Sequence, residues 1–188
     1  MSPLAKKLLL PFVCLLFLGC STPSDIPPIK SGDLDWARAI ADGVVADLYG
    51  EDLVMFAVAA TYLDISGFLY DGAQHPWWRF SYIGYEGLYV RVIVHPHGST
   101  TVTEGAGSFT SEIMFTYTSA DVRDWLDLAR YCYRLVTGRE DDACYGLEAF
   151  CSEYGSEARI ELYDAAFDPL ARAVIDMSVG TLISFELY

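Results

Sequence analysis

Residues 77–94 decide the fold, and they read Trp-Trp-Arg-Phe-Ser-Tyr-Ile-Gly-Tyr-Glu-Gly-Leu-Tyr-Val-Arg-Val-Ile-Val. Apolar and polar side chains alternate in two runs, Trp77–Ile83 and Leu88–Val94. The segment between them contains two glycines, as expected for two strands joined by a turn. The apolar faces of the two runs are Trp78, Phe80 and Tyr82, and then Val90, Val92 and Val94. Residues 95–98 predict another turn, and Ser99–Glu104 resumes the strand pattern. The stretch therefore predicts an antiparallel sheet with one buried face.

The sequence before this stretch predicts a helix and one more strand. Apolar residues recur at helical spacing over Asp33–Tyr49. Ser31 or Asp33 can cap the start of the helix, and Gly50 stands where a helix commonly ends. Leu53–Leu63 is a continuous apolar run, most simply a buried strand.

The second half begins again with a helix, which ends at Gly138. Its expected apolar stripe is Trp125, Leu128, Ala129, Cys132, Leu135 and Val136. Residues 144–153 fit either a strand or a helix. Three further strands are expected at Ala158–Tyr163, Ala171–Ile175 and Thr181–Leu187.

The two halves resemble each other in sequence. Residues 79–82 (Arg-Phe-Ser-Tyr) correspond to residues 159–162 (Arg-Ile-Glu-Leu), and Arg91 with the strand around it corresponds to Arg172 and its strand. Self-similarity at this spacing indicates a repeated supersecondary unit. We therefore expect an α+β fold of two units, 33–108 and 109–188, arranged as a tandem repeat in which each helix covers one face of a small antiparallel sheet.

This order of elements resembles the PepSY-type, cystatin-like folds of exported bacterial proteins. The resemblance rests on Trp78, Phe80, Tyr82, Val92, Val94, Gly98 and Val102, and on the hairpin at residues 174–180. It implies a binding, inhibitory or folding-assistance module rather than a catalyst.

Residues 1–19 have the pattern of an export signal. Lys6 and Lys7 precede the apolar stretch Leu8–Leu18, whose 11 residues are too few to span a membrane. Residues 17–20, Phe-Leu-Gly-Cys, resemble the lipobox of bacterial lipoproteins. The resemblance implies cleavage before Cys20 and a lipid, including palmitate, on that cysteine. The alternative is an ordinary secretory signal followed by a chance cysteine.

The residues after Cys20 predict an anchored, extended tether. Residues 20–32 contain three prolines and few apolar side chains, so they cannot bury a core. Several acyl chains on one cysteine give stable anchoring. By resemblance to Gram-negative lipoproteins, Ser21 after the cysteine implies the outer membrane, with the domain facing the periplasm.

Acidity is the strongest global feature of the mature chain. Removal of the signal takes away two of the 12 basic residues and none of the 26 acidic ones, which leaves a net charge of −16. This charge argues against binding to nucleic acid or to anionic headgroups. It would attract a basic protein or divalent cations, although solubility is the commoner reason for an acidic surface.

Three cysteines remain in the mature domain, and an oxidising compartment favours one disulfide. Cys132–Cys151 would join the second helix to the sheet, and Cys132–Cys144 is the alternative. Cys144 and Cys151 are too far apart to pair within one regular element.

Few residues indicate chemistry. His95 and His97 are weak candidates for a metal, because two ligands do not make a site and a turn with polar side chains is the simpler interpretation. Trp77 and Trp78 are candidate partner contacts, one facing the core and the other solvent. The chain has none of the common nucleophile or metalloprotease motifs, and we expect no cofactor.

The sequence thus predicts a non-catalytic, membrane-anchored envelope lipoprotein. It would bind or inhibit another envelope protein, for example a basic cell-wall enzyme or toxin. The first alternative is a structural or assembly subunit of an envelope complex, and an envelope hydrolase comes third.

Overall fold

The computed structural model describes residues 32–50, 52–84, 87–107, 114–152 and 155–188. The predicted signal peptide, the lipidation site Cys20 and residues 21–31 lie outside the described residues. No helix in the described part of the chain is long and apolar enough to cross a membrane.

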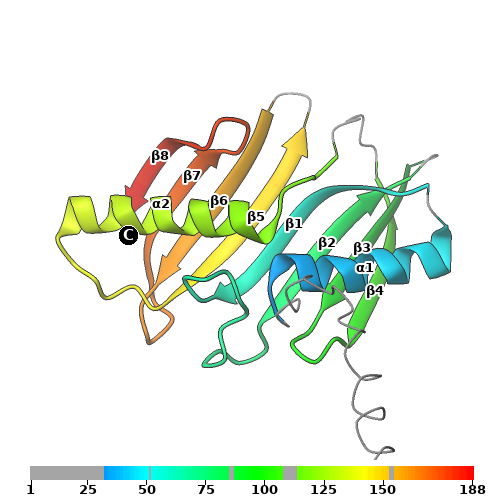
Figure 1. Ribbon diagram of the computed structural model, residues 1–188, viewed down its shortest axis with the longest axis horizontal. Helices are drawn as coiled ribbons and strands as arrows, with labels where there is room; N and C mark the ends of the chain where they lie inside the picture. Colours follow the sequence, from blue (N-terminus) through cyan, green and yellow to red (C-terminus); the bar gives the residue numbers. More distant parts are fainter. Residues whose placement is uncertain (1–31, 51, 85–86, 108–113, 153–154) are drawn as a thin grey trace, which may run out of the picture.

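The described residues form two helices and one antiparallel sheet of eight strands (Figure 1). The elements are α1 (Leu34–Tyr49), β1 (Val54–Leu63), β2 (Trp77–Ile83), β3 (Leu88–Val94), β4 (Thr100–Ala106), α2 (Ser119–Thr137), β5 (Cys144–Ser152), β6 (Gly155–Tyr163), β7 (Pro169–Asp176) and β8 (Thr181–Leu187). The strand order is β4-β3-β2-β1-β5-β6-β7-β8. The expected α+β class is confirmed. The sequence suggested two small sheets, but β1 pairs with β5 and joins all strands into one.

Local signals in the sequence set the ends of both helices. The Asp33 carboxylate accepts the backbone N–H of Trp36 at 2.9 Å, which confirms Asp33 as a cap of α1. Thr118 and Asp121 form a reciprocal capping box at the start of α2. Gly138 ends α2 in the left-handed conformation, with φ of 69°. The described part of the ambiguous segment 144–153 forms the strand Cys144–Ser152.

The core lies between the helices and one face of the sheet. α1 packs on β2 and β3, and α2 packs on β6, β7 and β8, so both helices cover the same face (Figure 1). The buried face of the first half is Trp78, Phe80, Tyr82, Val90, Val92 and Val94, as predicted, and that of the second half includes Ala158, Ile160, Leu162, Ala171, Ala173 and Ile175. No described helix covers the opposite face.

The two helices meet at their N-terminal ends. The backbone N–H of Asp35 donates to the Ser119 hydroxyl at 3.0 Å. The Arg38 guanidinium donates to the carbonyls of Phe115 at 2.5 Å and Tyr117 at 3.1 Å, just before α2 begins. These bonds connect the two halves beyond the shared sheet, because they cross from α1 to the segment leading into α2.

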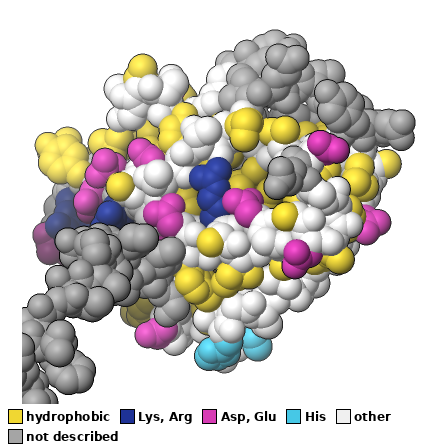
Figure 2. Space-filling model, turned by 45° about the vertical axis from the view of Figure 1, so that its right-hand side comes forward, with side chains coloured by type: hydrophobic (Ala, Val, Ile, Leu, Met, Phe, Trp, Pro, Cys, Tyr) yellow, Lys and Arg dark blue, Asp and Glu magenta, His cyan; other side chains and the backbone are white. Residues whose placement is uncertain are grey.

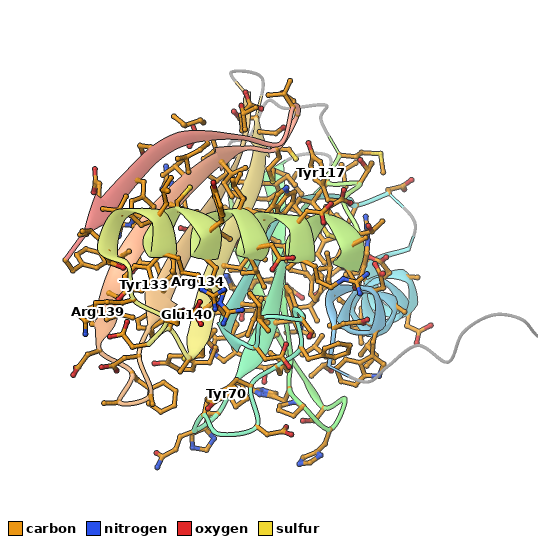
Figure 3. All side chains as sticks on the ribbon, turned by 60° about the vertical axis from the view of Figure 1, so that its left-hand side comes forward. Tyr70, Tyr117, Tyr133, Arg134, Arg139 and Glu140 are labelled. Atoms are coloured by element: carbon orange, nitrogen blue, oxygen red, sulfur yellow. The ribbon has the colours of Figure 1, made fainter. Side chains whose placement is uncertain are left out.

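The predicted disulfide is not formed, and Cys132, Cys144 and Cys151 are free thiols. Burial, with a smaller contribution from the nearby Cys151, raises the pKa of Tyr117, so Cys151 lies near the N-terminal end of α2. Cys132 is next to Tyr133, which Figure 3 shows at the other end of the helix. The helix rise puts about 20 Å between these positions, whereas a disulfide needs Cα atoms within about 7 Å.

The alternative bridge from Cys132 to Cys144 is also excluded. Cys151 shares the helix-facing side of β5 with Tyr145, as predicted from alternation. Cys144 is separated from Cys151 by an odd number of positions, so its side chain points to the opposite face. The sheet therefore stands between Cys144 and α2.

Two further expectations need correction. Trp78 is fully buried, and its indole N–H donates to the Gly32 carbonyl at 2.9 Å, so it is a core residue and not a partner contact. On α2, Leu135 and Val136 were placed on the core face but are 70% and 60% exposed. The sheet-facing stripe of this helix instead contains Val122, Trp125, Leu126, Ala129 and Tyr133.

Candidate functional site

The uncovered face of the sheet carries charged side chains in ordered rows. One row runs straight across four strands through Gly146, Glu161, Arg172 and Glu186, which are register partners in turn. These residues share the face because strand side chains alternate and their neighbours point into the core. Opposite charges lie side by side across the strands, an arrangement that stabilises a sheet by a few tenths of a kcal/mol to about 1 kcal/mol per pair.

A hollow of about 450 Å³ lies on this face over β1 and β5–β8. It is lined by Ala60, Thr61, Tyr62, Gly146, Leu147, Glu148, Arg159, Glu161, Tyr163, Arg172, Val174, Ser184 and Glu186. Gly146 keeps its floor low because it has no side chain; a Cβ there would fill part of the floor, in van der Waals contact with the ring of Tyr163 at 3.4 Å. The hollow therefore depends on a glycine on a central strand with larger side chains around it.

Glu161 organises one wall of the hollow. It accepts hydrogen bonds from Arg172 Nε at 2.7 Å and from the Tyr188 hydroxyl at 3.2 Å. This pairing raises the pKa of Arg172 above its ordinary value. Burial, with a contribution from Glu161, raises the pKa of Tyr163 to about 12, so its hydroxyl stays neutral at physiological pH. The wall thus offers both a fixed ion pair and a neutral hydroxyl.

Four arginines of the uncovered face each lie over an aromatic ring. The pairs are Arg79 over Trp77 at 5.6 Å, Arg91 over Tyr89 at 5.5 Å, Arg159 over Phe150 at 5.1 Å, and Arg172 over Tyr188 at 5.9 Å to the ring centroid. Such stacking contributes about 0.5–1 kcal/mol at exposed sites and keeps the guanidinium flat against the ring. The arginines are therefore oriented along the face.

Most basic side chains are already neutralised within the chain. Seven of the nine arginines form ion pairs with carboxylates, including Arg79 with Glu148 at 3.5 Å and Arg159 with Glu157 at 3.6 Å. The unmatched carboxylates hence carry the net acidity. On the side shown in Figure 2, acidic side chains are spread over the surface, and basic ones lie beside acidic ones. No one-sided acidic patch is visible there.

None of the site candidates from the sequence lines this hollow. His95 and His97 sit in the β3–β4 turn, where the His95 ring nitrogen is 3.4 Å from the Thr101 hydroxyl. Within the described ranges, no group of three or more His, Cys, Asp or Glu side chains is placed to hold a metal ion. Trp77 is half-buried on the uncovered face under Arg79. It remains a candidate contact, beside the hollow rather than in it.

A second polar cluster lies under the C-terminal half of α2 (Figure 3). The Asp142 carboxylate is fully buried, pairs with Arg130 at 2.8 Å and accepts the hydroxyl of Tyr145. Next to it, the Tyr133 hydroxyl donates to Asp141 at 2.6 Å, which lowers the pKa of that carboxyl. These contacts fix the loop between α2 and β5 against the helix, which is a structural role.

The sequence interpretation missed the hollow altogether. Arg159 and Arg172 were noticed only as signs of a repeat, and Glu161 and Gly146 were not singled out. One signal was available: a charged residue at every second position of a strand, as in Glu157, Arg159 and Glu161, marks an uncovered sheet face. Comparison with protein-family models, curated proteins and solved structures finds no match for this chain. The site is therefore interpreted from its own geometry.

Proposed function

We propose that this chain is a lipid-anchored, non-catalytic protein of the bacterial cell envelope that binds another envelope protein of basic charge. The recognition surface is the uncovered sheet face, and the observation that carries the proposal is the hollow on it. Glu148 and Glu186 line this hollow. Its volume suits a long basic side chain presented by a partner.

Charge supports a basic partner. Most arginines are already paired with carboxylates of the same chain, so the surplus carboxylates are available to an incoming cation. Within the described residues Glu186 has no ion pair at 4 Å or less, although it lies opposite Arg172 in the sheet. Association steered by such charge weakens as salt is added. A basic cell-wall enzyme or toxin, restrained by this protein, fits that chemistry.

The same proposal includes a tandem origin for the chain. Each half has a helix followed by four antiparallel strands, and the halves meet at β1 and β5. Arg79 and Arg91 in the first half correspond to Arg159 and Arg172 in the second, and all four stack on aromatic rings of the uncovered face. The resemblance to PepSY-type exported domains supports a binding role for both units, and the lipobox at Cys20 supports the anchor.

The test is affinity capture with residues 21–188, which contain every described element. Envelope extract is passed over this domain at low and high salt, and bound proteins are identified by mass spectrometry. We expect a basic protein that binds at low salt and is lost at high salt. Glu148→Gln with Glu186→Gln should weaken its binding about tenfold, consistent with loss of charge pairs at the contact.

A matched control separates the hollow from net charge. Asp47→Asn with Asp127→Asn removes the same two charges from the exposed outer sides of α1 and α2. We expect little change with this variant. Equal weakening by both variants would exclude the hollow as the contact. A salt-resistant set of envelope subunits, captured by all variants alike, would favour an assembly subunit instead.

A further inference from the structure

β8 is an end strand of the sheet with an apolar surface. No described strand lies beyond it, so its outer backbone groups have no partner strand. Eight of the ten large apolar side chains that are exposed in the described part of the chain lie on α2, on β8 or directly beside β8. They are Tyr131, Leu135, Val136, Val179, Leu182, Ile183, Leu187 and Tyr188. Exposed apolar groups are therefore concentrated at one end of the molecule.

The apolar flank of α2 continues this surface. Leu128, Cys132 and Leu135 follow one another at helical spacing, on the side of α2 opposite Arg130 and Arg134. Those two arginines face the loop that leads to β5. The apolar flank consequently faces β8, whose C-terminal end lies at the last turns of α2 (Figure 1). We call β8 and this flank of α2 the β8 surface.

We propose that two copies of this chain associate through their β8 surfaces, with the two β8 strands antiparallel. The register of β8 with β7 shifts at Ile183, which interrupts the regular ladder at that residue. On either side of it, antiparallel pairing of β8 with its own copy satisfies the outer backbone groups of both strands about a two-fold axis. The same axis brings the two apolar flanks of α2 toward each other. Ser184 and Glu186 of β8 line the hollow on the uncovered face, whereas the proposed contact uses the outer backbone edge of β8 and the flank of α2. The proposal goes beyond the proposed binding function.

The distribution of charge supports a second copy of this chain as the partner of the β8 surface. Two chains of net charge −14 repel each other over most of their surfaces. The β8 surface is the exception, because β8 carries one charged residue, Glu186, which points to the uncovered face beside Arg172. An apolar patch with few charges is where an acidic chain meets itself with least repulsion.

The other end of the sheet limits the assembly to two copies. β4 is rich in threonine and presents Glu104, whose carboxylate accepts the hydroxyl of Tyr49 at 2.5 Å. Charged and polar residues on an end strand oppose pairing with another chain. Once the two β8 strands are paired, only β4 ends remain exposed, and growth stops at the dimer.

The test is sedimentation equilibrium of residues 21–188 at micromolar concentrations and at low and high salt. We expect a reversible monomer–dimer equilibrium that strengthens with salt, because screening reduces the repulsion between two acidic chains. Binding of a basic partner has the opposite salt dependence, so failure of one proposal is distinguishable from failure of the other. A monomer at every concentration overturns the dimer.

Two substitutions test the surface. Ile183→Lys on β8, where the side chain is 55% exposed, should weaken the dimer at least about tenfold by placing like charges near the axis. Leu48→Lys on α1, at 61% exposure, is the matched control and should leave it unchanged. Near-ultraviolet circular dichroism checks that both fold. A dimer that survives Ile183→Lys, or that Leu48→Lys weakens equally, overturns the proposal.

Alkylation of Cys132 is an independent measurement. This thiol is half-buried on the α2 flank of the β8 surface. Its alkylation should slow as the protein concentration rises through the dimer range. In Ile183→Lys the rate should be fast at all concentrations. A rate that does not depend on concentration in the unmodified sequence, measured where sedimentation detects a dimer, would place the contact elsewhere.

Discussion

The two end strands of the sheet, β4 and β8, occupy equivalent places and have opposite character. Each is the last strand of its half, each has seven residues, and each is mostly exposed. β4 reads Thr-Thr-Val-Thr-Glu-Gly-Ala, whereas β8 reads Thr-Leu-Ile-Ser-Phe-Glu-Leu. The two end strands therefore share their topology but not their surface chemistry. Only the β4 end has the polar surface that opposes pairing with another chain.

The halves differ in their cores as well. The strands under α1 bury aromatic side chains, and those under α2 bury mainly aliphatic and small ones. Both sets belong to one continuous core, because β1 and β5 pair at the centre of the sheet. The two halves therefore differ in composition and in their outer surfaces, while the single core makes their stability shared.

The largest expected effect tests this shared stability. Phe80→Ala and the corresponding Ile160→Ala each remove a fully buried side chain from the centre of one half. We expect losses of about 4 and about 3 kcal/mol in the free energy of unfolding, from lost burial and the cavities left behind. Urea unfolding should remain one cooperative transition in both variants. Two transitions in Ile160→Ala would show that the halves unfold separately.

The sequence predicted the elements well because their signals are local. Alternation located β2 and β3, the Asp33 cap located the start of α1, and Gly138 located the end of α2. Joining of the strands into one sheet was not predicted, because β1–β5 pairing is a long-range choice that local pattern does not encode. The exposure of Leu135 was missed for a related reason. Helical spacing of an apolar residue indicates which face of the helix it lies on. It does not indicate whether the sheet extends far enough to cover that residue.

The candidate site was less predictable than the fold. Its residues come from five strands, and Arg172 becomes part of a wall only once its register with Glu161 and Glu186 is known. The tryptophan and histidine candidates from the sequence do not line the hollow. The hollow is built from ordinary charged residues around Gly146, and its chemistry lies in their arrangement.

A smaller effect should appear at high pH and belongs to the second half. Cys144 is fully buried, and burial raises the pKa of its thiol to about 11. The folded state therefore holds the proton more tightly than the unfolded chain, in which the thiol has a pKa of about 8.5. Its contribution to stability is complete below that value and is lost as the pH rises toward 11, at a slope of about 1.4 kcal/mol per pH unit.

Urea unfolding from pH 8 to 10 measures this loss. Buried tyrosines such as Tyr82, whose pKa burial also raises, add to it only above their ordinary pKa of about 10. Cys144→Ala should make the dependence over this interval shallower, and the remainder belongs to Cys151 and Cys132, because burial also raises the pKa of their thiols. Cys132→Ala is the matched control, and the dependence should remain in it. A flat profile in the unmodified sequence would contradict the burial of Cys144.

The thiols also differ in reactivity, which separates the outer surface of the second half from its interior. Cys132 is half-buried, whereas Cys144 and Cys151 are buried, and burial raises the pKa of all three. In dilute native protein Cys132 should react with a thiol reagent first, and the other two only at the rate of unfolding. Denatured protein should show three free thiols in the 21–188 domain. A count of one would restore the disulfide that the structure excludes.

The smallest expected effect removes the difference between the two ends of the sheet. Glu104→Leu takes the charge from β4 and leaves an end strand more like β8. Loss of the hydrogen bond with Tyr49 should cost little, because that bond is exposed to solvent, so the fold should persist. At high protein concentration we expect weak association of dimers through their β4 ends. The added leucine should stabilise each such contact by about 1 kcal/mol, because one apolar residue supplies little of an interface. Sedimentation velocity measures it, with Glu104→Gln as control. If Glu104→Leu stays dimeric, the threonines of β4 protect this end without the charge.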